Sequence, residues 1–204
     1  VPADMRRRAK RGLTESPGRK RYLTEADEIK LLAHATPAVS IAVQLAIDTG
    51  LRRGEMFSLT WPQIDFNGGT IYTTTDTKNH HSRVVPLPSR SAQNLAQLQA
   101  QQKGAKIATF NVFAHLKGSR RKDKHGKMRG RLPGEPLNDM AKGFRGAVRR
   151  AKLDDLIWHD LRRTAGCRWL QRDKRSMSEV SNLLGHSSVL VTEQRYAFLE
   201  RETV

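Results

Sequence analysis

The chain has 204 residues, and its 37 lysines and arginines against 20 aspartates and glutamates give a formal net charge of +17. Such an excess favours a polyanionic partner, of which nucleic acid is the commonest. The sequence contains no apolar run long enough for a membrane-spanning helix. Its single cysteine, Cys167, excludes an internal disulfide and a cysteine-rich zinc site, and it fits a reducing, cytoplasmic location.

The positive charge is concentrated in two segments. Residues 1–22 contain eight basic and two acidic residues, and residues 117–131 contain eight basic residues and only Asp123 as an acid. We expect residues 1–22 to form a flexible basic arm. We expect residues 117–136, which also contain glycine and proline, to form a mobile loop. Its basic side chains either bind phosphates or form a solvated surface, and the candidates for DNA contact are Arg120, Arg121 and Lys122.

Residues 23–204 are predicted to form one domain, mainly helical with a small antiparallel sheet (α+β). Thr24 is placed to cap a helix that begins with acidic residues. A second helix begins at Pro37, and a short one begins near Arg53. Apolar residues at helical spacing predict further helices over 89–102, about 140–151, 161–169, 180–184 and 188–195. Gly185 is expected to end the helix that precedes it.

A β-hairpin is predicted between the short helix near Arg53 and the helix over 89–102. The β-branched run at 70–75 and the segment 83–87 have the composition of strands, with Pro86 marking an edge or a strand end. The polar segment 76–82 between them is the turn. Lys78 is the only lysine in that turn.

A set of short motifs follows in a fixed order. The chain carries a Thr-Gly-Leu-Arg-Arg-Gly-Glu turn, the hairpin lysine, a His-Asp-Leu-Arg helical segment, a Leu-Leu-Gly-His segment and a tyrosine ten residues later. In this order and on these elements, the motifs resemble those of the tyrosine recombinases, or phage integrase family, over residues 23–198. The residues concerned are Arg52, Glu55, Lys78, His159, Arg162, His186 and Tyr196.

The chemistry of these residue types agrees with that resemblance. Attack on a DNA phosphodiester builds negative charge on its non-bridging oxygens, and two guanidinium groups can each donate paired hydrogen bonds to them. The resemblance assigns this role to Arg52 and Arg162. His159 lies three residues before Arg162, so both occupy one helix face. Tyr196 is the candidate nucleophile, and we expect nearby positive charges to favour its phenolate.

The resemblance also implies the remaining roles and the partners. Lys78 protonates the departing 5′-oxygen, His186 supports the phosphate, and Glu55 orients the active site. Tyr196 forms a 3′-phosphotyrosyl link with double-stranded DNA, and strands are exchanged through a Holliday junction, with no metal or other cofactor. The protein is expected to be a monomer in isolation and a tetramer on paired sites. Because relatives carry a separate N-terminal DNA-clamp domain, the chain is expected to be a catalytic fragment of a longer integrase from a phage or mobile element.

Several alternatives remain open from the sequence. Arg53 competes with Arg52 for the same role, and Arg53, His80 and Arg163 are weaker candidates for DNA contact. Tyr196 is alternatively interpreted as a half-buried core tyrosine with a structural role. A type IB topoisomerase, and a non-catalytic DNA-binding module with the same fold, are the competing functions.

Overall fold

The structure is a computed structural model, which describes residues 19–73, 82–122, 125 and 128–201. The helices in this part of the chain are α2 (Glu25–Ala33), α3 (Pro37–Thr49), α4 (Arg53–Phe57), η1 (Trp61–Gln63), α5 (Ser89–Gly104), α6 (Ala141–Arg150), α7 (Trp158–Gln171), α8 (Met177–Leu184), α9 (Val189–Tyr196) and α10 (Phe198–Arg201). The strands are β1 (Ile64–Asp65), β2 (Thr70–Thr73), β3 (Arg83–Pro86), β4 (Ser119–Lys122) and β5 (Met128–Arg131). The predicted helical domain with a small sheet is confirmed.

Local signals fix several helix ends where the sequence predicts them. The Thr24 hydroxyl accepts a hydrogen bond from the backbone N–H of Asp27 (3.1 Å), which caps α2. Gly50 and Gly185 end α3 and α8 in the left-handed conformation, with φ of 60° and 63°. Both turns matter for the site, because arginine side chains bond to the carbonyl groups of these two glycines.

The predicted hairpin is present as β2 and β3, which pair antiparallel with Ile71 opposite Val85. Strand β1 adds a third strand on the other side of β2, in the order β1-β2-β3. The buried residues of the sheet, Ile71 and Val85, face the helices, so the hairpin is attached firmly to the helical body.

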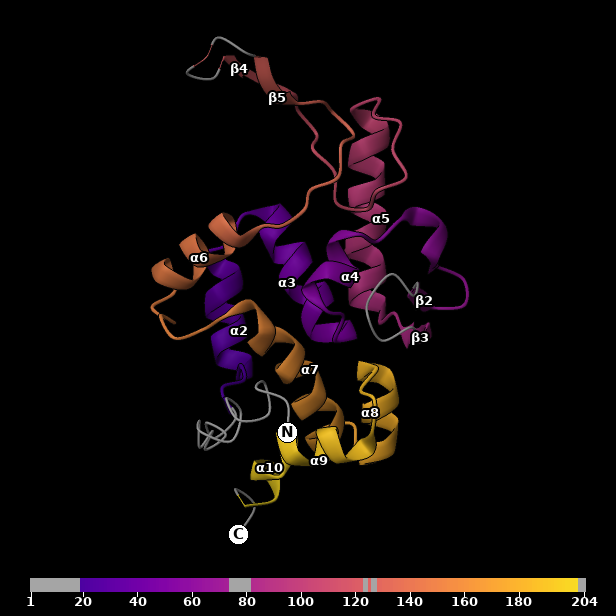
Figure 1. The fold of residues 1–204 in the computed structure, drawn as a ribbon, viewed down its shortest axis with the longest axis vertical. Helices are drawn as coiled ribbons and strands as arrows, with labels where there is room; N and C mark the ends of the chain where they lie inside the picture. Colours follow the sequence, from indigo (N-terminus) through magenta and orange to yellow (C-terminus); the bar gives the residue numbers. More distant parts are fainter. Residues whose placement is uncertain (1–18, 74–81, 123–124, 126–127, 202–204) are drawn as a thin grey trace, which may run out of the picture.

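The segment that was predicted to be a mobile loop forms a second hairpin. Strands β4 and β5 pair antiparallel from Ser119 opposite Arg131 to Lys122 opposite Met128. Figure 1 shows this ribbon projecting from the helical body beyond one end of α5. A two-stranded ribbon that extends into solvent has no buried face, so it leaves no alternation of apolar and polar residues for a sequence pattern to detect.

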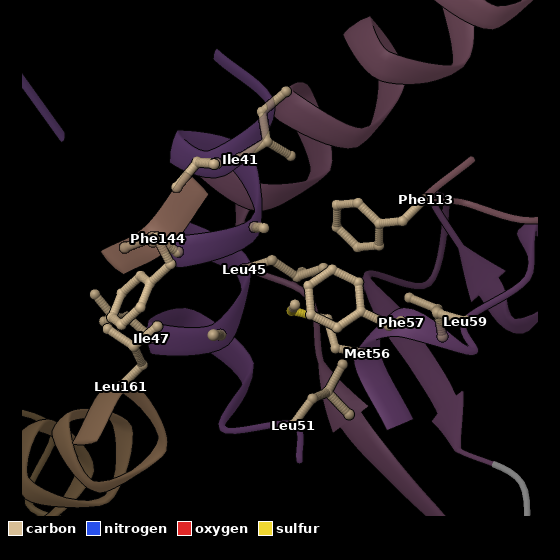
Figure 2. Close-up of a cluster of buried hydrophobic side chains, with 14 of the residues drawn as sticks. Ile41, Leu45, Ile47, Leu51, Met56, Phe57, Leu59, Phe113, Phe144 and Leu161 are labelled. Atoms are coloured by element: carbon tan, nitrogen blue, oxygen red, sulfur yellow. The ribbon is translucent and has the colours of Figure 1, made fainter. Parts of the chain in front are cut away.

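The hydrophobic core consists of two clusters that meet along α7. The larger one surrounds α3, which packs against α5 and α7, and Figure 2 shows Leu45, Phe57 and Phe144 among its members. The smaller cluster joins the second half of α7 to α8, α9 and α10. Leu161 belongs to the first cluster and Ala165 to the second. The motif residues of α7 therefore lie at the junction of the two clusters.

Among the described helices, none combines the length and the apolar character that crossing a bilayer demands.

Candidate active site

Arg52 stands at the residue that precedes α4, and Glu55 in the first turn of that helix fixes it. The backbone N–H of Arg52 donates to Oε2 of Glu55 (2.7 Å), and its Nη1 donates to Oε1 (2.8 Å). An acid three residues after the cap residue satisfies an N–H group that the helix itself leaves unpaired. Within the Thr-Gly-Leu-Arg-Arg-Gly-Glu motif, the carboxylate of Glu55 thus holds both the backbone N–H and the guanidinium of Arg52.

Arg162 projects from α7 into the interior and is almost completely buried. Its Nη1 donates to the carbonyl of Gly50 (2.5 Å), and its Nη2 donates to the carbonyl of Leu184. Burial, together with the neighbouring charges of Arg52 and Arg83, lowers the pKa of Arg162 to about 9. The guanidinium therefore remains charged at neutral pH, in a place where positive charge is already in excess.

Arg83 is a member of this site that the sequence analysis missed. It lies on β3, and its guanidinium forks onto Glu55, with Nη1 to Oε1 at 2.9 Å and Nη2 to Oε2 at 2.8 Å. Its position at the start of a strand gives no signal in the sequence, because an arginine there is usually a solvated edge residue. The pairing with Glu55 depends on a contact between residues 28 positions apart.

The carbonyl groups of three consecutive residues at the end of α8 organise these arginines. The last carbonyls of a helix have no partner within it and carry the negative end of its dipole. Each accepts a hydrogen bond from a different guanidinium: Leu183 from Arg83 (2.8 Å), Leu184 from Arg162, and Gly185 from Arg52 (2.6 Å). We call Arg52, Arg83 and Arg162 the arginine cluster.

The arginine cluster is paired with one carboxylate, that of Glu55. Burial by itself would raise the pKa of Glu55, but hydrogen bonds and charge from Arg83 and Arg52 outweigh it and lower the pKa to about 2. Three guanidinium groups therefore face one permanently ionised carboxylate. The remaining positive charge is of the kind that favours binding of an anion.

A cavity of about 430 Å³ opens beside the arginine cluster. Its lining combines basic side chains with apolar ones: Leu51, Arg52, Arg53, Ile157, Trp158, His159 and Arg162. His159 is one of these lining residues, and partial burial and the charges of Arg162 and Arg163 lower its pKa. The cavity thus brings the two predicted phosphate-binding arginines together with the predicted histidine.

His186 follows the α8 turn directly and lies close to the arginine cluster. Its Nδ1 is 2.7 Å from the hydroxyl of Thr192, which fixes the orientation of the ring. Burial, followed by the charges of Arg162, Arg195 and Arg52, lowers the pKa of His186 to about 4. At neutral pH the imidazole is therefore neutral and keeps one N–H for donation.

Tyr196 lies at the end of α9, in the smaller core cluster. The residue is 3% exposed, and its hydroxyl packs against α7 so closely that a Cβ on Gly166 would overlap it. Burial raises the pKa of Tyr196 to about 12, despite the charges of Arg162, Arg163 and Arg195. These charges favour the phenolate, as expected, but in this conformation the burial of the phenol has the larger effect on its pKa.

The weaker candidates for DNA contact fall into three groups. Arg53 is exposed at the cavity, and Lys122 is exposed on β4, where Arg120 and Arg121 also lie. Arg163 is buried, and its Nη1 donates to Asp160 (3.2 Å), which replaces the expected DNA contact with a role inside the fold. Lys78 and His80 lie outside the described residues.

Comparison with known sequences assigns these motifs to a family. The sequence profile of the phage integrase family matches residues 21–202. The shufflon-specific DNA recombinase of Escherichia coli is 30% identical over 90% of this chain and 41% of its own length. The integrase of Salmonella phage P22 is 26% identical over 89% of this chain and 44% of its own. The chain thus spans less than half of these two relatives.

Solved structures share the fold at low sequence identity. The XerA recombinase superposes with a TM-score of 0.71 at 18% identity, over 92% of this chain and 66% of its own. The catalytic domain of bacteriophage HP1 integrase has a TM-score of 0.60 at 22% identity, over 91% of this chain and 94% of its own. The Tn1549 transposon integrase in complex with transposon DNA gives 0.69 at 19%, over 94% and 68%. The predicted catalytic-domain fold is confirmed.

Proposed function

The chain belongs to the phage integrase family, and from this premise we propose that it is the catalytic part of a site-specific DNA recombinase that cleaves and rejoins strands through a 3′-phosphotyrosyl intermediate. The observation that carries the proposal is the arginine cluster, which holds three guanidinium groups around the single carboxylate of Glu55. This arrangement lies beside an open cavity and at the junction with the helix that carries Tyr196.

The scissile phosphate binds at Arg52 and Arg162 in the proposed reaction. Both guanidinium groups are held by backbone carbonyls before DNA arrives, so little reorganisation is needed when negative charge develops on the phosphate oxygens. His186, neutral and oriented by Thr192, donates a hydrogen bond to the same phosphate. His159, which lines the same cavity, is the second histidine of the proposed phosphate site.

Tyr196 is the proposed nucleophile. Its phenol oxygen forms the new bond to phosphorus while the bond to the 5′-oxygen breaks. The phenol loses its proton to a neighbouring base, and the 5′-oxygen takes one from Lys78, so a free 5′-hydroxyl is released. Because each phosphodiester is exchanged for a phosphotyrosyl ester, the proposed reaction needs no nucleotide as an energy source, and the guanidinium groups take the charge-stabilising role that a metal ion would otherwise have. Attack also requires that the hydroxyl leave its packing against Gly166, so α9 must shift before cleavage.

Recombination is favoured over a topoisomerase by the names of the relatives, which include a shufflon-specific DNA recombinase and a phage integrase. Structural neighbours have been solved in complex with DNA, among them the Tn1549 integrase and a lambda integrase dimer on a core site. We therefore propose double-stranded DNA as the partner, and we propose that the protein is a monomer in isolation and a tetramer on paired sites.

Replacing Tyr196 by phenylalanine tests the proposal with a change of one oxygen atom. The protein is mixed with supercoiled plasmid in EDTA and quenched with SDS, and relaxed plasmid and covalently attached protein are measured. We expect both products with the unaltered chain and neither with Tyr196→Phe. The matched control is Tyr72→Phe, which removes the hydroxyl of an exposed tyrosine on β2 and should leave both products in place.

Any of three results would contradict the proposal. Covalent attachment that persists in Tyr196→Phe would place the nucleophile elsewhere. Cleavage that requires Mg²⁺ and leaves no attached protein would indicate a metal-dependent nuclease. Binding of DNA without any cleavage, when a synthetic site with a nick opposite the target strand traps the intermediate, would indicate the non-catalytic module.

A further inference from the structure

Arg83 has its three side-chain nitrogens bonded to protein atoms. Nη1 and Nη2 bond to the two oxygens of Glu55, and Nε donates to the carbonyl of Leu183 (2.8 Å). The side chain is 10% exposed, whereas that of Arg52 is 33% exposed. Of these two partners of Glu55, Arg52 is the one open to a ligand, and Arg83 lies behind it.

The turn after α8 is shaped around Arg83. A Cβ on Gly185 would lie 2.9 Å from Nη1 and 3.2 Å from Cδ of Arg83. Glycine is thus needed there for two reasons, the left-handed backbone and the close approach of the arginine. His186 follows immediately, so Arg83 also supports the turn from which this histidine projects.

The contacts form a chain from β3 to Arg52. Arg83 holds both oxygens of Glu55, and the same two oxygens accept hydrogen bonds from the backbone N–H and from Nη1 of Arg52. A carboxylate held on one side by a bidentate fork has little freedom to rotate. The position of the Arg52 guanidinium therefore depends on Arg83, although Arg83 does not lie between this guanidinium and the cavity.

We propose that Arg83 is a positioning residue for cleavage, which fixes Glu55 so that Arg52 meets the scissile phosphate in a single geometry. This inference rests on the proposed function. It predicts that the hairpin whose turn carries Lys78 is coupled to the phosphate site through β3.

The charged groups around Glu55 determine what happens when Arg83 is removed. Arg52 faces it from the start of α4, Arg83 from β3 and Arg162 from α7, and His186 lies in the turn behind the cluster. Without Arg83, burial would raise the pKa of Glu55, and the carboxylate would take up a proton in mildly acidic solution. Cleavage by the variant should then fall at acidic pH, where the unaltered chain keeps Glu55 ionised.

The test compares Arg83→Met, Arg83→Lys, Glu55→Gln and the double variant Arg83→Met with Glu55→Gln. Arg83→Met should slow covalent attachment by about 10–100-fold, a range typical for a residue that orients a reacting group. Affinity for duplex DNA should stay nearly constant. Arg83→Lys keeps the positive charge and should fold more readily than Arg83→Met. Because a lysine cannot donate to both oxygens of Glu55, this variant should recover only part of the rate. Arg90→Met, which removes a paired arginine remote from the cavity, is the control for a purely structural loss.

The double variant distinguishes a positioning role from a direct one. If Arg83 acts through Glu55, its removal should cause no further loss in the Glu55→Gln background. A further 10-fold loss there, or a parallel fall in DNA affinity, would show that Arg83 contacts DNA itself and would overturn the proposal.

A measurement that needs no cleavage separates this inference from the proposed function. In the NMR spectrum, the Nε–H signal of Arg52 should be sharp in the unaltered chain and broadened or lost in Arg83→Met, while Arg90→Met leaves it unchanged. An unchanged Arg52 signal in Arg83→Met would sink the inference even if Tyr196 proves to be the nucleophile. The expected change would sustain the positioning role even if plasmid cleavage is never observed.

Discussion

Two groups of arginines in this molecule differ in how their charge is balanced. In the arginine cluster, Arg52 and Arg83 bond to the carboxylate of Glu55, and Arg162 lies in the field of the same single carboxylate. Behind it, helices α2, α3, α5 and α7 are joined by a second group that we call the Glu28 network, which consists of Glu28, Asp48, Arg90 and Arg168. There Glu28 bonds to Arg90 (2.8 Å) and to Arg168 (2.6 Å), and Asp48 also pairs with Arg90.

The difference teaches how to separate structural arginines from functional ones. The Glu28 network contains as many acids as bases, so its charges balance within the protein, and its ion pairs hold the helices together. The arginine cluster has more guanidinium groups than carboxylates, and backbone carbonyls supply hydrogen bonds but no net charge. Its balance is completed only when an anion such as a phosphate arrives.

The largest expected effect is the loss of Arg52. Arg52→Ala should slow covalent attachment to DNA by about 10²–10³-fold, the usual cost of removing one donor to a developing oxyanion. Thermal stability should change little, because the side chain is partly exposed. Arg53→Ala is the matched control, since it removes the adjacent exposed arginine at the same cavity. An equal loss in both variants would mean that the phosphate site does not depend on the register assigned here.

A smaller effect, on stability and not on cleavage, is expected in the Glu28 network. Glu28→Gln leaves the buried side of Arg168 without its carboxylate and should lower the free energy of unfolding by about 2–4 kcal/mol. Cleavage measured well below the melting temperature should be unaffected. Urea denaturation checks the first point, with Glu25→Gln on the exposed part of the same helix as the control. A cleavage defect that is independent of stability would show that the Glu28 network, like the arginine cluster, has a role in the reaction.

The smallest effect concerns protonation of His186. Its pKa is lowered to about 4 in the fold, so below the ordinary histidine pKa the unfolded chain binds a proton that the folded chain rejects. Stability should therefore fall as pH drops from about 6.5 toward 4 and level off below, by about 1–2 kcal/mol after allowance for solvent screening. Urea denaturation at about pH 7 and about pH 4.5 should show a smaller difference for His186→Gln than for His34→Gln, a change at an exposed histidine. Equal differences would place His186 outside the field of the arginine cluster.

Much of the fold and part of the site could be predicted from the sequence. Helical periodicity and capping residues such as Thr24 and Gly185 are local signals, and they gave the helices and their ends. Arg52 and Arg162 were found because each belongs to a short motif. Their convergence on the α8 carbonyls is a property of packing that no local pattern contains.

The remaining features depend on contacts between distant residues. Arg83 and Glu55 are far apart in the sequence, and nothing around Arg83 distinguishes it from an edge-strand arginine. Arg163 shows the reverse error: its neighbour Arg162 suggested a surface role, but helix geometry directs it to the buried carboxylate of Asp160. For Tyr196 the sequence left a nucleophile and a core tyrosine as alternatives, and its burial depends on the absence of a side chain at Gly166.

The packing of Tyr196 over Gly166 gives the proposed reaction a built-in conformational equilibrium. If the displaced form of α9 makes up about 1% of molecules, the observed rate on DNA is about 100-fold below that of the displaced form. Any contact that binds the displaced form more tightly can raise the rate by up to that factor without touching the arginine cluster. Strand cleavage and control over its timing would then be encoded by different residues of the same domain.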